Sequence, residues 1–422
     1  MENKTNLLID VNQYEKGLQK RLTIDGKTQE YQSYFIPIER LYYNDLNGRI
    51  STYIEEYNDL NQENISNLYK NDKEKYNDLI AKFIIESAND KGESFKNTKN
   101  DIHDKGQQNP GVILSDGRII DGNRRFTAIR ELYKETGNPK FSFFEAVVLD
   151  APSENNIDGW KTIKTLELYL QFNVDEKKGY NTIDFLVSFY KDVMNPETRM
   201  FDTKQYAFAS GKKPTEIKQY QRTVNVMLDY LEWINKPRAF YILKNEKLDG
   251  PLEEIAKKTN KMSDEEWMNI RDDIYNYLTH VSSGDRTREV RELLNSAKNH
   301  TPLYEEFSKN MKKNDLPVRL AEATVSKGEK SKSPDESARK KQEALKLEKT
   351  IRELYNSAYL KQVTEDNFNE PVNLIADMNE KIGKIDIHMF KNLPDVKLQA
   401  LKKEISLLER KVAELKESIF NE

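Results

Sequence analysis

The sequence predicts an α+β protein: a small mixed α/β domain near the N-terminus, mostly helical domains after it, and coiled-coil helices at the C-terminus. Between residues 110 and 149, short apolar runs alternate with turn-forming residues, which is typical of strands joined by tight turns. From about residue 161 onward, apolar residues recur at intervals of three and four, which indicates helices. Hydrophobic residues make up 37% of the 422 residues and charged residues 33%, so we expect several modest domains rather than one large core.

The composition also excludes several functional classes. The chain has no cysteine, so disulfides, thiolate metal sites and cysteine nucleophiles are ruled out. Its four histidines lack the spacing of a metal site. We find no signal-peptide pattern and no run of about 18 apolar residues, so we expect a cytoplasmic protein without a membrane span. Because the net charge is −4, binding to nucleic acid would need a local basic face.

The first hundred residues predict an extension, a strand and a helical insertion. In chain order we expect an extension at 1–34, a strand at 35–41, a turn at 47–49, a helical insertion at 50–78, a helix at 79–88 and a polar loop at 89–105. The helix at 79–88 is predicted because its apolar residues recur at helical spacing, whereas residues 89–105 are mostly polar.

A strand–turn–strand–turn–helix pattern follows. Strands are expected at 110–114 and 118–120, joined by a turn that contains Asp116-Gly117, a pair that tolerates the positive φ of hairpin turns. A second turn at 121–123 leads into a helix at 124–133, and residues 143–149 predict a further strand.

The turn before this helix is suited to bind an anion. The first N–H groups of a helix lack internal partners, and the helix dipole favours negative charge there. Gly122 lets the backbone approach a phosphate closely, and Arg124 and Arg125 can add charge-assisted hydrogen bonds. The alternative is an ordinary surface turn with two solvated arginines.

The context of this turn resembles the N-terminal domain of the ParB-like family, whose fold is shared with sulfiredoxin. The family motif Gly-x-x-Arg-x-x-Ala is matched by Gly122-Asn-Arg-Arg125-Phe-Thr-Ala128. Weaker similarity is found at Gly106-Gln-Gln-Asn-Pro110, at Ile36-Pro-Ile38 through Asn47-Gly-Arg49, and at Leu168 to Val174. The resemblance spans residues 35–235 and is specific at 106–128.

The resemblance implies a nucleotide site and a dimer that closes around DNA. The nucleotide would be CTP or another nucleoside triphosphate, with magnesium as its usual companion. Carried over by position, the nucleotide-binding residues are Gly106, Gln107, Gly122, Asn123, Arg124, Arg125, Ala128 and Asn173. The family glutamate before that asparagine falls on Phe172 here, which makes nucleotide binding a firmer expectation than hydrolysis. Sulfiredoxin activity is excluded because it needs a cysteine in this turn.

Residues 203–222 predict a helix-turn-helix. Ala207 is small where two helices would cross, Gly211 suits the turn, and Pro214 suits the first turn of the second helix. This stretch carries five basic residues against one acid, Glu216. We expect Thr215, Lys218 and Gln219 to face base edges, and Lys204, Lys212, Lys213 and Arg222 to contribute the basic face towards phosphates. The alternative is a helical hairpin with a solvated basic face.

The C-terminal residues have the spacing of a coiled coil. Apolar residues alternate by three and four at Leu398, Leu401, Ile405, Leu408, Val412, Leu415 and Ile419. A parallel pair would place Glu404 opposite Glu409, whereas an antiparallel pair could match Glu404 with Lys411. A second seam at 344–358 could instead pair with this one inside the same chain.

Two functions from different classes follow. The first is a nucleotide-gated, sequence-specific protein that binds double-stranded DNA as a homodimer, in segregation, plasmid or phage maintenance, or regulation. The second is an NTPase, phosphotransferase or nuclease-linked enzyme of DNA modification or phage defence, with Asp121 or Glu176 as metal ligand or base. The expected domains are an extension (1–34), a nucleotide-binding domain (35–160), a helix-turn-helix domain (161–240), a helical region without assigned role (241–325), a charged linker (326–337) and a self-association region (338–422).

Overall fold

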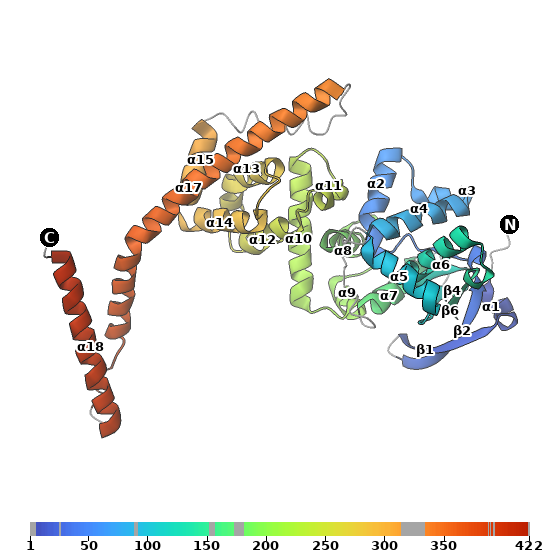
Figure 1. Cartoon of the computed structure of the whole chain (residues 1–422), viewed down its shortest axis with the longest axis horizontal. Coiled ribbons are helices and arrows are strands. Elements are labelled where there is room, and N and C mark those ends of the chain that lie inside the picture. The colour runs from blue at the N-terminus through green and yellow to red at the C-terminus, as the bar shows by residue number, and fades with distance from the viewer. Residues whose placement is uncertain are drawn as a thin grey trace. The chain divides into compact units, whose positions relative to one another are not determined.

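The structure is a computed structural model that describes residues 6–24, 27–87, 92–151, 157–172, 181–313, 334–386, 388, 390 and 393–420. The chain divides into two compact units, residues 1–355 and 356–422. The first unit holds a mixed sheet with helices, followed by a largely helical part, and the second is helical (Figure 1). The predicted α+β class is therefore confirmed.

The sheet has six strands in the order β1-β2-β6-β4-β5-β3. They are β1 (Lys16–Ile24), β2 (Lys27–Pro37), β3 (Tyr42–Tyr43), β4 (Gly111–Leu114), β5 (Arg118–Asp121) and β6 (Phe143–Leu149). The pairs β1–β2, β2–β6 and β4–β5 are antiparallel, and β3–β5 and β4–β6 are parallel. The predicted hairpin at 110–120 and the strand at 143–149 are both present.

The N-terminal segment belongs to this sheet. Residues 16–24 and 27–34, expected to lie in an extension, form β1 and most of β2, and Tyr34 pairs with Ala146 of β6. These strands were not predicted because most of their side chains are polar and reach solvent. Leu22 and Ile36 are among the few buried apolar side chains. The strand predicted at 35–41 ends at Pro37 and is followed by a 3₁₀ turn, Ile38–Arg40.

Helices pack on both faces of the sheet. They are α1 (Leu7–Asp10), α2 (Ser51–Asn61), α3 (Ile65–Asn71), α4 (Lys73–Glu86), α5 (Glu93–Lys105), α6 (Asn123–Thr136) and α7 (Ile157–Phe172). The prediction of a loop at 89–105 is wrong for residues 93–105, which form α5. Phe95 and Ile102, seven residues apart, bury one face of α5, and two such residues were too few to show as a periodic pattern.

Two apolar clusters separate the faces of the sheet. Ile113 and Ile119 belong to the cluster that includes Phe126 and Phe144, whereas Val112 and Leu114 belong to the cluster that includes Ile163 and Leu170 of α7. Neighbouring residues of a strand thus enter opposite clusters, as the two-residue period of a strand requires. The end of β5 and the start of α6 are consequently held between two packed layers.

The rest of the first unit is helical. It contains α8 (Thr182–Phe189), a π-helical turn η5 (Tyr190–Met194), α9 (Thr203–Ser210), α10 (Pro214–Trp233), α11 (Phe240–Asn245), α12 (Asp249–Thr259), α13 (Asp264–His280), α14 (Arg286–Asn299) and α15 (Pro302–Lys313). Residues 326–333 of the predicted linker lie outside the described residues. Its last four residues, 334–337, are the start of α17 (Pro334–Gly383).

The first part of α17 is packed into this helical region. Leu347, Ile351 and Tyr355 are buried, and the Tyr355 hydroxyl donates to Glu292 Oε2 of α14 at 2.5 Å. The Tyr355 ring also lies 5.7 Å from the Tyr277 ring of α13. Within the first unit, the seam that begins at residue 344 therefore packs against α13 and α14.

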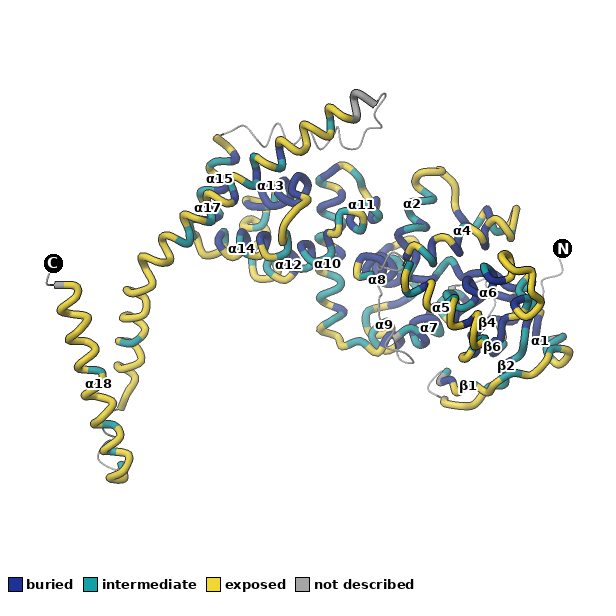
Figure 2. Tube along the Cα trace, in the orientation of Figure 1, coloured by how far each residue is buried: buried dark blue, intermediate teal, exposed yellow. Residues whose placement is uncertain are grey.

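The second unit contains α17 from residue 356 onward and the whole of α18 (Asp395–Phe420). The helix that carries the 344–358 seam, α17, continues to Gly383 through Pro371. Both segments are exposed along most of their length (Figure 2). No helix among the described residues has the length and apolar character needed to cross a membrane.

Candidate functional site

The turn at the end of β5 requires glycine. Gly122 has a φ of +97° and is the N-cap residue of α6. A Cβ added to Gly122 would lie 2.9 Å from Phe144 Cζ and 3.3 Å from Gly111 Cα, closer than ordinary contact. The positive φ and the close neighbours thus both disfavour a larger residue.

The N-terminus of α6 is open to an anion. The helix has 14 residues, no side chain caps its first turn, and no acidic residue lies there. Uncapped N–H groups and the helix dipole together favour a negatively charged group at this end. Arg124 and Arg125 are half-buried in the same turn. The arrangement is suited to phosphate oxygens.

A cleft of about 360 Å³ opens in front of this turn. It brings together the predicted residues Asp121, Gly122, Asn123, Arg124 and Arg125. Its other lining residues are Asn47, Arg49, Ile84, Ser87, Thr98, Ile120 and Gln171. This volume lies within the lower range of small-molecule sites.

The charges at the base of the cleft are partly satisfied within the protein. Asp121 Oδ2 lies 3.2 Å from Arg125 Nη2 and 3.3 Å from Lys20 Nζ. Lys20 Nζ also donates to the Pro110 carbonyl at 2.6 Å. Among the described residues, Arg125 Nε and Asn123 Oδ1 are buried polar atoms without a hydrogen-bond partner. A buried polar atom without a partner is costly, so these two atoms favour a polar ligand in the cleft.

Three predicted nucleotide-binding residues do not line the cleft. Gln107 is engaged with β6, since its Nε2 donates to the Glu145 carbonyl at 2.7 Å and its Oε1 accepts from Glu145 N at 3.0 Å. Gly106 ends α5 with a φ of +75°, and Ala128 is buried in the core. Asn173 and the candidate base Glu176 lie outside the described residues.

Sequence reasoning missed part of the cleft wall. Asn47 and Arg49 come from the turn that resembled the Asn-x-Arg turn of the ParB-like family, which was a usable signal. Asn47 Oδ1 accepts from Arg49 N at 3.1 Å and holds the turn. Gln171 had no such signal, because one polar residue on an amphipathic helix is ordinary.

A buried ionic cluster lies behind this wall. Lys164 Nζ lies 3.0 Å from Glu167 Oε2 and 3.5 Å from Asp192 Oδ2, and all three side chains are nearly inaccessible. Glu167 Oε1 accepts from Gly48 N at 3.0 Å and from Gln171 Nε2 at 3.2 Å. Burial raises the pKa of Asp192 to about 6, against the attraction of Lys164. The cluster therefore supports the 47–49 turn from inside the protein.

The second candidate catalytic residue, Asp121, is already held by two cations. Its carboxylate pairs with Lys20 and Arg125 and is therefore engaged within the protein. Within the described part of the chain, no group of three His, Cys, Asp or Glu side chains could hold a metal ion.

A helix-turn-helix is formed by α9 and α10. Asp202 caps α9 by accepting from Lys204 N and Gln205 N, each at 2.8 Å. Gly211 has a φ of +68°, and Lys212 N donates to the Ala207 carbonyl at 3.1 Å across the turn. Pro214 is the first residue of α10. The predicted turn and both helices are therefore present.

The second helix packs on two neighbouring helices. Ile217 of α10 is buried. The Tyr220 ring lies edge-on to Phe185 and Phe189 of α8, with centroid distances of 4.8 and 5.7 Å. The helix α10 is therefore anchored on α8 as well as on α9.

Most of the predicted DNA-contacting residues are exposed. The exposed ones are Lys204, Lys213, Thr215, Lys218 and Arg222. Lys212 is half-buried, with Nζ 3.7 Å from Glu216 Oε1. Gln219 is also half-buried, and its Nε2 lies 3.4 Å from Thr223 Oγ1. Five of the seven side chains thus form an accessible face around the start of α10.

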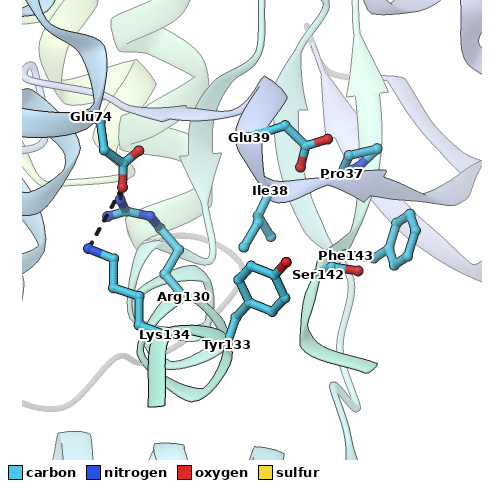
Figure 3. Close-up of a pocket in the computed structure, with 9 residues that line it drawn as sticks. All are labelled: Pro37, Ile38, Glu39, Glu74, Arg130, Tyr133, Lys134, Ser142 and Phe143. Atoms are coloured by element: carbon cyan, nitrogen blue, oxygen red, sulfur yellow. Dashed lines mark hydrogen bonds and ion pairs between the residues drawn. The ribbon is translucent and has the colours of Figure 1, made fainter. Parts of the chain in front are cut away.

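A second cleft of about 510 Å³ lies elsewhere in the N-terminal domain (Figure 3). Its lining residues are Pro37, Ile38, Glu39, Glu74, Arg130, Tyr133, Lys134, Ser142 and Phe143. Its cations are already paired: Arg130 Nη2 lies 2.6 Å from Glu74 Oε1 and 3.0 Å from Asp78 Oδ1, and Lys134 also pairs with Asp78. None of the predicted site residues lines it, so the Gly122 cleft is the better candidate site.

No protein-family model and no curated protein matches this chain. Two solved structures are similar to it. A Pnob8-like ParB-N domain in a C2221 crystal form aligns over 63% of this chain and 97% of its own, with 13% identity and a TM-score of 0.34. The C-terminally truncated chromosome-partitioning protein ParB from Caulobacter crescentus, complexed to the centromeric parS site, covers 48% and 88%, with 13% identity and a TM-score of 0.27.

TM-scores this low carry no argument about function. The resemblance to the ParB-like family rests instead on this chain's own residues and on the order of its elements. A hairpin, a glycine turn, a helix with two arginines and then a helix-turn-helix occur in the expected order.

Proposed function

We propose that this chain is a ParB-like protein that binds double-stranded DNA through α9 and α10 and is gated by a nucleotide bound in the Gly122 cleft. The observation that carries the proposal is the start of α6. There, an uncapped helix N-terminus, a glycine with positive φ and two arginines open into one cleft. The exposed basic face of the helix-turn-helix supplies the second half of the proposal.

The nucleotide would be held chiefly by its phosphates. The N–H groups at the start of α6 would donate to phosphate oxygens, and Arg124 and Arg125 would add charge. Arg125 would exchange part of its ion pair with Asp121 for the phosphate, and its unpartnered Nε would gain an acceptor. CTP is the nucleotide that the family resemblance implies. Magnesium, if used, would be held through the phosphates.

Gating has a route within the first unit. The helix α7 carries Gln171 in the wall of the cleft and Lys161 near its other end. Lys161 Nζ donates to Gln205 Oε1 of α9 at 2.8 Å, and Gln205 in turn completes the capping box of α9. A ligand that moved α7 would therefore act on the first helix of the helix-turn-helix.

The basic face would bind DNA mainly through phosphates. The exposed Lys204, Lys213 and Arg222 would contact phosphates, and Thr215 with Lys218 would reach base edges in the major groove. We propose that the protein acts as a homodimer in DNA segregation, plasmid or phage maintenance, or regulation, because such sites are read by paired half-site contacts.

The test is a binding screen of the full chain. CTP, ATP, GTP and UTP would be titrated by calorimetry, with and without magnesium and with and without mixed DNA fragments. We expect one nucleotide to bind most tightly and to change the affinity for DNA. Turnover measured in the same samples tests the enzymatic alternative. A chain that binds none of the four nucleotides, or no DNA at low salt, would contradict the proposal.

A further inference from the structure

The helix α18 carries an apolar stripe that is largely exposed in the described part of the chain. Its apolar residues recur by three and four over residues 398–419. Ile405, Leu415 and Ile419 are 44%, 45% and 66% exposed. An exposed stripe three heptads long is typical of a helix that pairs with another helix.

Among the described residues, Leu398, Leu401 and Leu408 of this stripe are half-buried, whereas the remainder of the stripe is exposed. The first half of α17 uses its own seam, Leu347, Ile351 and Tyr355, within the first unit. The second half of α17 is itself exposed at its apolar residues Phe368, Val372 and Ile382. The occupant that the charges favour is therefore a second copy of α18.

A parallel pair of α18 helices would set like charges against each other. With Leu398 and Ile405 at a and Leu401 at d, the flanking residues at g would face the e residues of the second copy five positions later. Glu404 would then meet Glu409, and Lys411 would meet Lys416. Both contacts are repulsive, and the two-fold symmetry makes each of them twice.

In an antiparallel pair, the flanking charges attract each other instead. When Ile405 of one copy packs against Leu408 of the other, Leu401 meets Val412 and Leu398 meets Leu415. In this register the flanking residues also become complementary: Glu404 meets Lys411, and Lys402 meets Glu409. Each of these layers and charge pairs is again made twice.

We propose that two copies of this chain pair antiparallel through α18 in the register that places Ile405 against Leu408. The inference names the partner of the homodimer in the proposed function and its geometry, but it depends on neither nucleotide nor DNA binding. At about 1.5 Å per residue, the two Asp395 ends would lie roughly 35 Å apart, at opposite ends of the coil.

Disulfide trapping in the full chain tests the register. The chain has no cysteine, so each introduced thiol is unique. We expect Leu401→Cys mixed with Val412→Cys, after exchange of subunits, to form a disulfide-linked heterodimer under mild oxidation. Leu401→Cys alone should not crosslink, because the two copies of residue 401 lie far apart in the antiparallel register. Rapid crosslinking between the two copies of residue 401 would overturn the proposal in favour of a parallel pair.

Charge exchange is the second test, read as a dimer dissociation constant by sedimentation equilibrium. Glu404→Lys turns two attractions into repulsions and should weaken the dimer roughly ten-fold. The same change would strengthen a parallel pair, because the introduced ammonium group would then face Glu409. Adding Lys411→Glu should restore the antiparallel dimer.

Two other outcomes would overturn the pairing. One is a wild-type chain that stays monomeric at all concentrations. The other is a trapped contact between residue 401 and the second half of α17 of the same chain. Nucleotide binding and half-site DNA binding, measured on the same variants, should not change, so a failure here is distinguishable from a failure of the proposed function.

Discussion

The Gly122 cleft and the helix-turn-helix face both carry positive charge, but they hold it differently. In the cleft, Arg125 is 23% exposed at its side chain and is paired with Asp121. On the helix-turn-helix, Lys213, Lys218 and Arg222 are exposed. Partly buried, oriented charges recognise a ligand by geometry and are weakly screened, whereas exposed cations bind phosphates in a manner that falls with salt. The contrast leads to four predictions, given from the largest expected effect to the smallest.

The largest effect should come from removing exposed charge. The triple variant Lys204→Ala, Lys213→Ala, Arg222→Ala should weaken DNA binding by about 10²–10³-fold at moderate salt, because up to three phosphate contacts are lost. The slope of log affinity against log salt should become shallower by about 2.7. Fluorescence anisotropy with a salt titration measures both. The matched control, Lys298→Ala, Lys309→Ala, Lys312→Ala, removes the same net charge from exposed positions elsewhere. An equal loss in that control would show a non-specific charge effect.

The second prediction concerns the paired arginine of the cleft. Arg125→Ala should weaken nucleotide binding by about 10- to 100-fold, the equivalent of one or two charge-assisted hydrogen bonds. DNA affinity without nucleotide should be unchanged. Calorimetry and anisotropy on the same sample measure the two. Arg222→Ala is the reciprocal control, with normal nucleotide binding and weakened DNA binding. Loss of both activities in Arg125→Ala would point to unfolding instead.

The third prediction compares the two glycines at the ends of α6. Gly122 and Gly137 both have positive φ, but only Gly122 would bring a Cβ into close contact. Gly137→Ala should lower the free energy of unfolding by about 1–2 kcal/mol because of its positive φ. Gly122→Ala should lower it further, because the added Cβ would also press against Phe144 and Gly111. Only Gly122→Ala should also weaken nucleotide binding, by about ten-fold, since only that turn must approach a phosphate closely. Equal nucleotide affinity in the two variants would contradict the assignment of the turn.

The smallest effect concerns the buried cluster behind the cleft. Burial raises the pKa of Asp192 to about 6, above that of an unfolded aspartate. The folded state therefore keeps this proton longer than the unfolded state does, and stability falls as pH rises from about 4 to about 6. Asp192→Asn should flatten that part of the stability curve, which is measured as the difference between variant and wild type in chemical denaturation. The comparison with wild type is needed because carboxyls with a lowered pKa, such as Asp78 and Glu216, make stability rise with pH. Their contribution cancels when the stability of the variant is subtracted from that of the wild type. An unchanged difference across this range would exclude Asp192 as the titrating group.

Local features could be predicted at residues whose type favours a particular backbone conformation, as glycine and proline do. Gly122 and Gly211 were identified as turn residues, and both have positive φ. Pro214 was expected in the first turn of a helix and begins α10. Such residues restrict the backbone through their own sterics, so their positions can be inferred without knowledge of the neighbours.

Features that depend on distant neighbours were missed. The strands β1 and β2 have mostly polar side chains, and their stability comes from pairing with each other and with β6. The helix α5 was hidden because only Phe95 and Ile102 face the core. Gln107 was assigned to the nucleotide, but its amide bonds to the backbone of Glu145. No local pattern reports such contacts.

The sequence alone therefore determined the α+β class, the glycine–arginine turn, the helix-turn-helix and the heptad spacing of α18, because each follows from local backbone sterics or from a short repeat. The tertiary structure decided which residues meet: Asn47, Arg49 and Gln171 join the Gly122 turn in one cleft, and the seam that begins at residue 344 packs against α13 and α14 within the first unit. A pattern of apolar and polar residues indicates which face of a helix or strand packs against the rest of the protein. The partner that covers it depends on the free energy of packing between segments far apart in the chain.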